Sequence, residues 1–481
     1  KQRMKVEGSV QMGAIPVNLV WEDRFEDGAP YDSRYLMSAR IDDVNDVRDL
    51  GVDPGALASD MISGGIDAEI GYTVFDKRTA RLEVGADITR AEIRVPALDW
   101  RKDGGDSGHA DVTILLENGL IKSVPKFEVT SRDLSVQGDI VYSAGGLGLE
   151  RVNLKRVLFG RTDVSGAVIA RADGSWEVGL QGGELDFAPL WDRVMNDRPG
   201  KKTDIPDITI VVEIDKLWTD KQRFLGEVSG TFVHKRDIWR TVLVDSKING
   251  QSQLNIDMAP DASGNRVLGV TAENAGDALR FFDLFKNMYG GRLEIRGQYD
   301  DAAPTRPLNG KLRVVDYRVR KAPLMTRILS IMALTGIVDA MTGEGLNFDE
   351  LDVPFTVLDG ELRIREAKAT GTSIGFTASG IIYTHADVIN LQGTVVPVYA
   401  VNSFLGKIPL LGNIFTGNEE GGGIFAANFN VTGPIEDPTT SVNPLSALTP
   451  GILRNLFGVI GSRGNPGPLS DPLPDGGVLI Q

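Results

Sequence analysis

The sequence predicts a mainly β (α+β) protein built on an extended, mostly antiparallel sheet with short helices interspersed. Three observations lead to this fold class. Apolar and polar residues alternate with a period of two over most of the chain, which is the pattern of half-buried strands. Gly or Asn recurs about every 8 to 12 residues, as expected for turns between short strands. The 481 residues allow about three compact domains or one long repetitive body.

The first half of the chain carries this alternation in a looser form. Strands are expected over 64–75, 80–95 and 109–124. Asn118 and Gly119 mark a turn inside the last of these segments. A helical spacing of apolar residues over 44–61 precedes them. Further short strands follow in GSWEVGLQGGELDF, PDITIVVEIDKLW and LGEVSGTFVHKRDIWRTVLVDSKING.

Strands of the second half share one opening pattern: Gly, a charged residue, Leu, a charged residue and an apolar residue. It occurs in GRLEIRG at 291–297, GKLRVVDYRVR at 310–320 and GELRIREAKA at 360–369. Residues 425–431 alternate in the same way. Because strands of the same phase tend to be neighbours, we expect their apolar residues to share one face. These residues are Leu293, Ile295, Leu312, Val314, Leu362, Ile364, Phe425, Phe429 and Val431.

Helical segments interrupt the strands. The segment 275–289, like 44–61, leads into Gly-Gly and then a strand, which suggests an internal repeat at the level of pattern. Three later segments, 324–341, 401–415 and 452–460, are apolar around most of the helix. They are either buried core helices or helices that face lipid or plug a groove. The Pro- and Gly-rich residues 461–481 predict a flexible tail.

Composition excludes several classes of protein. The chain has no Cys, and therefore no disulfide framework, thiolate metal site or cysteine nucleophile. Its 51 Lys and Arg against 66 Asp and Glu give a net charge of −15, which argues against a nucleic-acid partner. The longest apolar helical run, Ile328 to Met341, would span about 21 Å, less than the roughly 30 Å hydrocarbon layer. We expect no segment of this chain to cross a bilayer.

No catalytic constellation is recognisable. His109, His234 and His385 are the only histidines, and they are far apart in sequence. A catalytic or metal site needs several convergent polar groups, so each histidine is expected to be structural or solvated. Residues 371–375 match the GxSxG motif, but the residues after it read as a strand, whereas a nucleophile elbow needs a helix there.

Metal and cofactor sites are not predicted either. The glycine-rich stretch around Asp103, Asp106 and Asp111 fits neither an EF-hand nor a glycine-rich calcium repeat, and reads as a polar hairpin tip. No phosphate-binding loop or dinucleotide fingerprint is present. The sequence therefore predicts a protein without catalytic residues, metal or cofactor.

The segment 391–457 is the most distinctive part of the chain. It contains GTVVP, NSFLGKIPLLG, GGGIFA, VTGPIEDP and VNPLSALTPGILR. In these motifs it resembles the C-terminal region of the AsmA-like family, most closely the YhdP-like branch. NAGDALRFFDLFKNMYGGRLEIRG, and KAPLMTRILSIMALTGIVDAM before GLNFDELDVPF, are similar to the same family. Residues before about 265 share only its repetitive strand pattern.

This resemblance implies a long, twisted antiparallel sheet curled into an open apolar groove, with apolar C-terminal helices. It divides the chain into a repetitive β-groove segment (1–264), an AsmA-like C-terminal region (265–460) and a flexible Pro/Gly-rich tail (461–481). A stack of about 25 strands at roughly 4.8 Å each would run on the order of 120 Å, so the sheet must curl or split.

The resemblance also implies a function. It is non-catalytic, bridge-like transport of phospholipid between the inner and outer membranes of a double-membraned bacterium, with acyl chains sliding along the groove. The alternative is a periplasmic scaffold or assembly factor for outer-membrane proteins, which would bind partners through exposed strand edges. The expected partners are phospholipids, both membranes and an outer-membrane protein.

The expected location is the periplasm. The opening residues KQRMKVEGSV lack a signal-peptide core and read as interior sequence, so we expect a fragment of a longer protein. The resemblance implies an inner-membrane anchor helix outside this chain.

Two sets of site residues follow from the resemblance. The nine apolar strand residues given above would line the groove and contact lipid. The apolar helices would lie nearest the outer membrane. Their candidate membrane-proximal residues are Ile328, Ile331, Met332, Phe404, Leu410, Leu411, Leu456 and Phe457.

Overall fold

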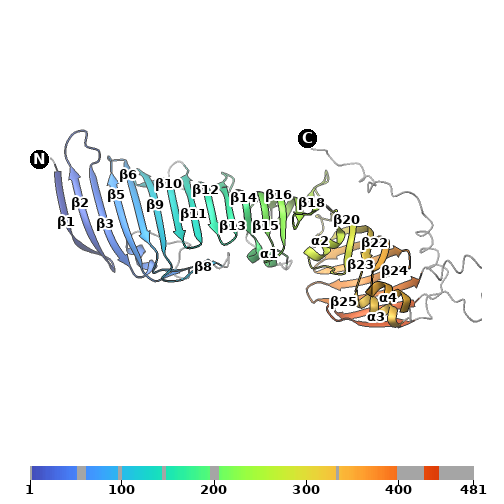
Figure 1. Ribbon diagram of the computed structural model, residues 1–481. Helices are drawn as coiled ribbons and strands as arrows, with labels where there is room; N and C mark the ends of the chain where they lie inside the picture. Colours follow the sequence, from blue (N-terminus) through green and yellow to red (C-terminus); the bar gives the residue numbers. More distant parts are fainter. Residues whose placement is uncertain are drawn as a thin grey trace, which may run out of the picture. The chain divides into compact units, whose positions relative to one another are not determined.

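The computed structural model describes residues 3–50, 61–95, 100–143, 148–195, 205–331, 335–397 and 427–443 (Figure 1). These residues are mainly in strands, with a few short helices, which confirms the predicted mainly β class. The chain forms two compact units. The first contains Lys1–Asp197 and Thr203–Ile238, and the second contains Arg198–Lys202 and Trp239–Gln481.

The first unit has thirteen strands in its main sheet and a small three-stranded sheet. The main-sheet strands are β1 (Arg3–Met12), β2 (Ile15–Arg24), β3 (Ser33–Ile41), β5 (Ile66–Val74), β6 (Thr79–Asp87), β9 (Gly108–Glu117), β10 (Leu120–Ser131), β11 (Leu134–Tyr142), β12 (Leu149–Phe159), β13 (Thr162–Ala170), β14 (Trp176–Asp186), β15 (Ile208–Trp218) and β16 (Phe224–Lys235). The small sheet contains β4 (Ile62–Ser63), β7 (Glu92–Val95) and β8 (Trp100–Lys102). Two helices are described, the 3-10 helix η1 (Val44–Leu50) and α1 (Ala188–Met195).

The thirteen strands pair with their neighbours in chain order, so the sheet is a long meander. Its pairings are antiparallel apart from β14 with β15, which run parallel. A parallel pair needs a crossover connection, and α1 lies in the chain between these two strands. At the β9–β10 hairpin, Asn118 and Gly119 have φ of 53° and 79°, as a two-residue turn that follows the sheet twist requires.

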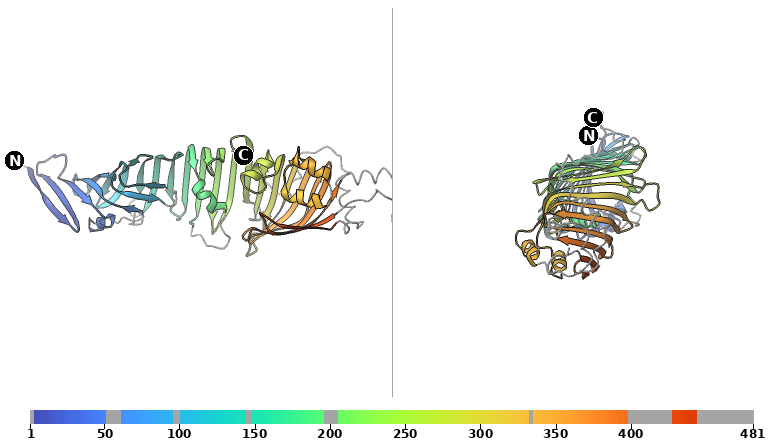
Figure 2. Two further views of the ribbon diagram at one scale, coloured as in Figure 1. Left: turned by 60° about the horizontal axis from the view of Figure 1, so that its bottom comes forward. Right: turned by 90° about the vertical axis from the view of Figure 1, so that its right-hand side faces the viewer.

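The second unit is an eleven-stranded meander whose pairings from β17–β18 to β26–β27 are antiparallel. Its strands are β17 (Ile238–Ile248), β18 (Ser252–Pro260), β19 (Arg266–Ala272), β20 (Met288–Tyr299), β21 (Leu308–Val319), β22 (Leu346–Leu358), β23 (Glu361–Gly371), β24 (Ile374–Tyr383), β25 (Val388–Pro397), β26 (Ala427–Pro434) and β27 (Thr439–Asn443). Its described helices are α2 (Ala275–Phe281), α3 (Pro323–Ile331) and α4 (Thr335–Thr342). Figure 2 shows the strands of this unit stacked beside α3 and α4.

Within each unit, the described helices follow strands that end at one and the same edge of the sheet. In the first unit η1 follows β3, α1 follows β14, and the small sheet lies between the β6 and β9 ends; β8 and α1 lie along this edge in Figure 1. In the second unit α2 joins β19 to β20, and α3 with α4 joins β21 to β22. We call this side of each sheet the helix edge. The opposite side, where hairpins such as β5–β6 and β20–β21 turn, we call the turn edge.

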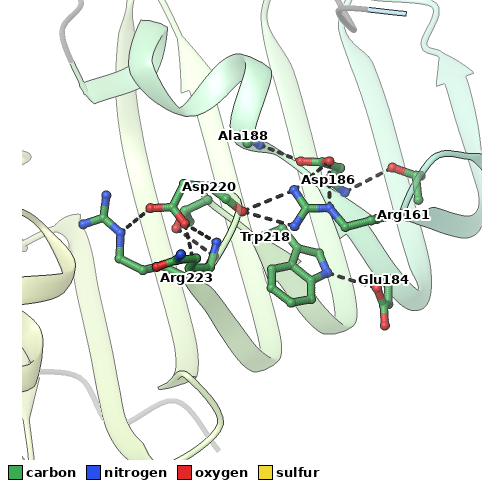
Figure 3. Close-up of polar contacts among 10 residues, drawn as sticks. Arg161, Glu184, Asp186, Ala188, Trp218, Asp220 and Arg223 are labelled. Atoms are coloured by element: carbon green, nitrogen blue, oxygen red, sulfur yellow. Dashed lines mark hydrogen bonds and ion pairs between the residues drawn. The ribbon is translucent and has the colours of Figure 1, made fainter.

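A polar cluster fixes the sheet where the parallel pair breaks the meander (Figure 3). Arg161, in the β12–β13 turn, donates to the Asp186 carboxylate at 2.9 and 3.1 Å and to the Asp220 carbonyl at 3.2 Å. Its guanidinium lies 4.5 Å from the Trp218 ring centre. Asp186 also accepts from the Ala188 N–H at the start of α1. The cluster therefore ties the first turn of α1 to the turns on both sides of the crossover.

The helices are shorter than the sequence predicts. The 275–289 helix ends at Phe281, and Asp283 has a φ of 56° that ends the helical path. Arg280, in the last turn of α2, donates to the carbonyl of Met288, where β20 already begins. The expected 324–341 helix is two helices, α3 and α4. Of 44–61 the structure describes the 3-10 helix η1. The segments 401–415, 452–460 and 461–481 lie outside the described residues.

The boundary between the units differs from the one expected from the resemblance. The compact units meet in the chain at Ile238 and Trp239, whereas residues 264 and 265 lie in the β18–β19 turn inside the second unit. The expected division at 264/265 concerns family relationship, and it stays a prediction.

Candidate lipid-contacting face

Cross-strand register defines one face of the first unit row by row. Residues directly opposite each other on paired strands carry their side chains on the same side of the sheet. Following the pairs from β1 to β16 gives a central row of Gly8, Leu19, Met37, Ile70, Val84, Val112, Phe127, Gly138, Leu154, Gly166, Leu180, Val212 and Gly230. Every member is apolar or Gly. We call the face that contains this row the lining face.

Two rows beside the central row are also apolar. Toward the helix edge lies the deep row of Val10, Val17, Ala39, Ala68, Ala86, Ala110, Val129, Val136, Val157, Val164, Gly182, Ile214 and Val228. Toward the turn edge lies the aromatic row of Val6, Trp21, Tyr35, Tyr72, Leu82 and Ile114. None of these residues was predicted from the sequence as a site residue, although segments 64–75 and 80–95 carry the alternation that places several of them.

The opposite face is mostly polar, although the exposed Leu36 and Val211 also belong to it. One row of this face, level with the gap between the central and deep rows, consists of Ser9, Asn18, Ser38, Glu69, Gly85 and Asp111. A hollow of about 820 Å³ in the first unit lies over this face. A twisted sheet is hollowed on both faces along different directions, so this hollow does not mark the lining face.

Burial of the lining face falls from the helix edge to the turn edge. Near the helix edge Ile15, Ile41 and Ala68 are 2%, 6% and 5% exposed, and they form a core cluster with Val47 of η1 packed against it. Toward the turn edge the aromatic-row side chains are only half-buried, and Val6 on β1 is 44% exposed. The lining face is therefore covered at the helix edge and open at the turn edge.

Three aromatic side chains stand together on the open side of this face. The ring centres of Trp21 and Tyr35 are 5.8 Å apart and nearly parallel, and those of Tyr35 and Tyr72 are 6.0 Å apart. The next row outward is polar on β2 and β3, where Asp23 accepts from Trp21 Nε1 at 2.7 Å and from Ser33 Oγ at 2.6 Å. Its other members are Met4, Val74, Ala80 and Leu116. On β2 and β3 the aromatic row therefore borders a hydrogen-bonded polar pair.

The second unit brings together the sequence-derived strand residues that the structure describes. Leu293 pairs with Val314, and Ile295 pairs with Leu312. The same face continues through β22, where Phe355 pairs with Ile364. Following the pairs through β24 and β25 leads to the last members on β26. Leu293, Ile295, Leu312, Val314, Leu362, Ile364, Phe429 and Val431 therefore lie on one face. Phe425 lies outside the described residues.

Burial on this face follows the same direction as in the first unit. Leu293 and Val314, nearer the helix edge, are 6% and 0% exposed, whereas Ile295 and Leu312 are half-buried. At the helix edge α2 approaches β20 so closely that a Cβ on Gly276 would lie 2.5 Å from the Met288 carbonyl oxygen. Short helices thus cover one side of the lining face in this unit too.

The membrane-proximal candidates have contrasting environments. In α3, Ile328 is 2% exposed, whereas Ile331 is 52% exposed. Arg327 on the same helix donates to the Pro438 carbonyl at 2.9 Å and pairs with Asp437 at 3.2 Å, which ties α3 to the β26–β27 turn. The remaining candidates lie outside the described residues: Met332, Phe404, Leu410, Leu411, Leu456 and Phe457. Within the part of the chain that the structure describes, no helix is long and apolar enough to cross a membrane.

A buried ion pair closes the turn edge of the second unit at β19 and β20. The Arg266 and Asp301 side chains are 9% and 10% exposed and meet at 2.8 Å. The Arg266 guanidinium also donates to the Trp239 carbonyl and lies 3.9 Å from the Tyr299 ring centre. Hydrogen bonds from Arg266 hold the pKa of the Asp301 carboxyl below its usual value, while burial raises the pKa of the Tyr299 hydroxyl.

The histidines occupy separate environments. His109 Nε2 lies 3.3 Å from Asp111 on a strand surface, and His234 is buried with its Nδ1 3.2 Å from the Pro206 carbonyl oxygen. Residues 371–375 form the hairpin between β23 and β24, not the strand-to-helix turn of a nucleophile elbow. Among the described residues, no group of three or more His, Asp or Glu side chains is placed to hold a metal ion.

A buried lysine, Lys102, lies beside the acidic cluster. Lys102 is 2% exposed, and its ammonium donates to the carbonyls of Thr89, Ala91 and Asp103 at 2.9 to 3.2 Å. Burial lowers the pKa of this ammonium, and the nearby carboxylates of Asp106 and others oppose that shift. The lysine organises the loop between the small sheet and β9.

Comparisons with known proteins give no match: no family model, no curated protein and no solved structure is similar to this chain.

Proposed function

We propose that this chain is a non-catalytic, bridge-like conduit for phospholipid, along which acyl chains slide over the lining face. The observation that carries the proposal is the continuity of the apolar rows across thirteen paired strands of the first unit. An ordinary antiparallel sheet buries such a face against a second layer. Here much of the face is only half-buried, so it has apolar contact area to offer to a ligand.

Length favours a conduit over a single lipid pocket. Twelve strand spacings at roughly 4.8 Å extend the rows over about 60 Å, twice the roughly 30 Å hydrocarbon thickness of a bilayer. Each buried methylene contributes about 0.8 kcal/mol, so several methylenes in contact hold a chain. Because neighbouring positions along a row present similar side chains, a step along the row exchanges one apolar contact for another and creates no deep trap.

The sequence resemblance supplies the wider setting of the proposal. In that setting the protein acts in the periplasm of a double-membraned bacterium, anchored in the inner membrane through a helix outside this chain. Its lipids move between the inner and outer membranes, and an outer-membrane protein is its partner. No cofactor or chemical step is involved.

The alternative proposal is a periplasmic scaffold for outer-membrane proteins. It is favoured by the position of β27 as the last strand of the described meander, because the end strand of a sheet can add a strand from another chain. A scaffold binds protein in fixed proportion, whereas a conduit binds lipid. Lipid extraction of the purified protein followed by mass spectrometry separates these two proposals.

A pair of adjacent substitutions tests the conduit directly. Val112, in the central row, and Thr113, on the polar face, are neighbours on β9. Val112→Asp places an unpaired carboxylate among apolar side chains at a cost of several kcal/mol to a passing acyl chain. We expect Val112→Asp to remove copurifying phospholipid and to stop lipid transfer between donor and acceptor vesicles. Thr113→Asp should leave both unchanged.

The two variants can be compared only if both are folded. Circular dichroism should give the same strand signal for both variants and the parent chain. Unchanged lipid content and transfer in folded Val112→Asp would refute the conduit, and stoichiometric protein in place of lipid would favour the scaffold.

A further inference from the structure

The aromatic row has the position of an interface between lipid tails and headgroups. Trp and Tyr rings suit a place where one end is apolar and the other is wet, which is why they gather at headgroup level in membranes. Trp21 has this arrangement: its ring stacks on Tyr35 at 5.8 Å, while its Nε1 donates to the Asp23 carboxylate in the next row outward.

The distance from the aromatic row to the helix edge fits an acyl chain. On β3, Tyr35 and Ile41 are six residues apart, which corresponds to roughly 20 Å of strand. One leaflet contributes about half of the roughly 30 Å hydrocarbon layer. A chain lying along the strands from the aromatic row therefore ends before η1 covers the lining face at Ile41.

From this placement we infer that the first unit holds phospholipids in one orientation across its strands. The headgroup lies at the turn edge beside Asp23 and Ser33, and the acyl chains lie along the strands from the aromatic row toward the deep row and the helix edge. Lipids advance sideways from strand to strand in this orientation. The inference rests on the proposed conduit function and adds a fixed polarity to it.

Strand β1 allows a test with little disturbance of the fold. Val6, Val10 and Met12 are 44%, 40% and 37% exposed and lie opposite Trp21, Val17 and Ile15 on the lining face. They sample the whole distance from the aromatic row to the helix edge. The alternating residues Glu7 and Gln11 are exposed on the opposite face. Because the chain has no Cys, each position can carry a single thiol-linked fluorophore.

The experiment uses the full chain with one labelled cysteine at a time, as Val6→Cys, Val10→Cys or Met12→Cys. Each variant is mixed with phospholipid vesicles that carry a nitroxide quencher either on the headgroup or at the end of an acyl chain. We expect headgroup quenching to be strongest for Val6→Cys and weakest for Met12→Cys, and chain-end quenching to follow the opposite order. Glu7→Cys and Gln11→Cys should be quenched by neither lipid.

A second series tests the inner strand β3, with Tyr35→Cys in the aromatic row, at the level of Val6, and Met37→Cys in the central row. Equal quenching along β1, or the reversed order, would overturn the fixed orientation and leave the conduit standing. Absence of quenching at every lining position in folded protein would overturn the orientation and the conduit together.

Discussion

At the scale of single residues, one buried ion pair lies at the turn edge of the second unit. Arg266 and Asp301 form the most buried ion pair of the described salt bridges, and the guanidinium also contacts the Trp239 carbonyl and the Tyr299 ring. Removing one partner of such a pair leaves an uncompensated buried charge, which costs far more than losing an exposed pair. The pair therefore fixes the turn edge of the second unit at the ends of β19 and β20.

We expect Asp301→Asn to lower the free energy of unfolding at pH 7 by about 3 kcal/mol, because the Arg266 charge loses its partner. Asp316→Asn is the matched control: it breaks an exposed pair with Arg292 and should cost less than about 1 kcal/mol. Denaturant titration of the second-unit transition measures both. Equal effects would show that Asp301 is not held as a buried charge.

The same pair predicts an acid dependence. The pKa of Asp301 is lowered in the folded state, so its contribution to stability is present above the ordinary aspartate pKa of about 3.9 and is lost as the pH falls through the lowered value. The stability difference between the parent chain and Asp301→Asn should shrink as the pH falls from about 5 to about 2. A difference that stays constant over this range would contradict the assignment.

The buried position of Lys102 is a residue-scale feature that could not be predicted from the sequence. The acidic residues Asp103, Asp106 and Asp111 were predicted to form a polar hairpin tip, and this is wrong: Asp103 and Asp106 lie in the connection between β8 and β9, which do not pair, and Asp111 lies within β9. The lysine itself gave no signal, because the three carbonyls that receive its ammonium come together only when the β6–β9 connection folds back. Long-range backbone contacts of this kind leave no local pattern in sequence.

At the scale of elements, glycines in the lining face leave space that aromatic side chains of the facing strand occupy. A Cβ on Gly138 would lie 2.4 Å from Phe127 Cζ and 2.2 Å from the Asn153 carbonyl oxygen, because the Phe127 ring lies over the glycine opposite it. In the second unit Phe429 covers Gly393 in the same way. An aromatic ring over a facing glycine keeps the apolar rows continuous where one strand has no side chain.

We expect Gly138→Ala to destabilise the first unit by about 1–3 kcal/mol, since the ring and the strand must both shift. Gly179→Ala is the matched control. It lies inside β14 with no atom within 4 Å of its added Cβ, so it should be neutral or stabilise by up to about 1 kcal/mol through reduced freedom of the unfolded chain. Chemical denaturation of the two variants compares them. Equal stabilities would mean that Phe127 moves away at no cost.

Helix boundaries were the least predictable elements. The apolar spacing over 275–289 continues past the end of α2, because Met288 and its neighbours belong to a strand whose own alternation overlaps the helical pattern. Strands were predicted more reliably, since period-two alternation and turn residues such as Gly119 agree with each other along the chain. The irregularity at Asp316, where φ is 57° and the buried positions change phase between Val314 and Tyr317, was not predicted.

At the scale of the whole molecule, the sequence predicted the mainly β class and a shared phase for strands of the second half. The register places Leu293, Ile295 and their partners on one face through uninterrupted antiparallel pairing. What the sequence could not predict is which edge of the sheet is covered. Within each unit that depends on the helices following strands that end at the same edge, η1 and α1 in the first unit and α2 and α3 in the second. This property becomes visible only once every strand direction is known.

A conduit formed by one continuous face makes a prediction that separate binding sites do not. Val112 on β9 and Leu180 on β14 both belong to the central row of the first unit, five strand spacings or roughly 24 Å apart. If lipids pass along one row, a block at either position stops every lipid that must pass it.

We expect Val112→Asp and Leu180→Asp each to stop vesicle-to-vesicle transfer, and the double variant to be no slower than either single variant. Independent sites would instead give partial losses that multiply in the double variant. Transfer rates of the parent chain, both single variants and the double variant, measured on protein with an unchanged strand signal, distinguish these outcomes. If the double variant instead showed the product of two partial losses, the single route would be rejected, because a block at one position of a single route already stops all transfer.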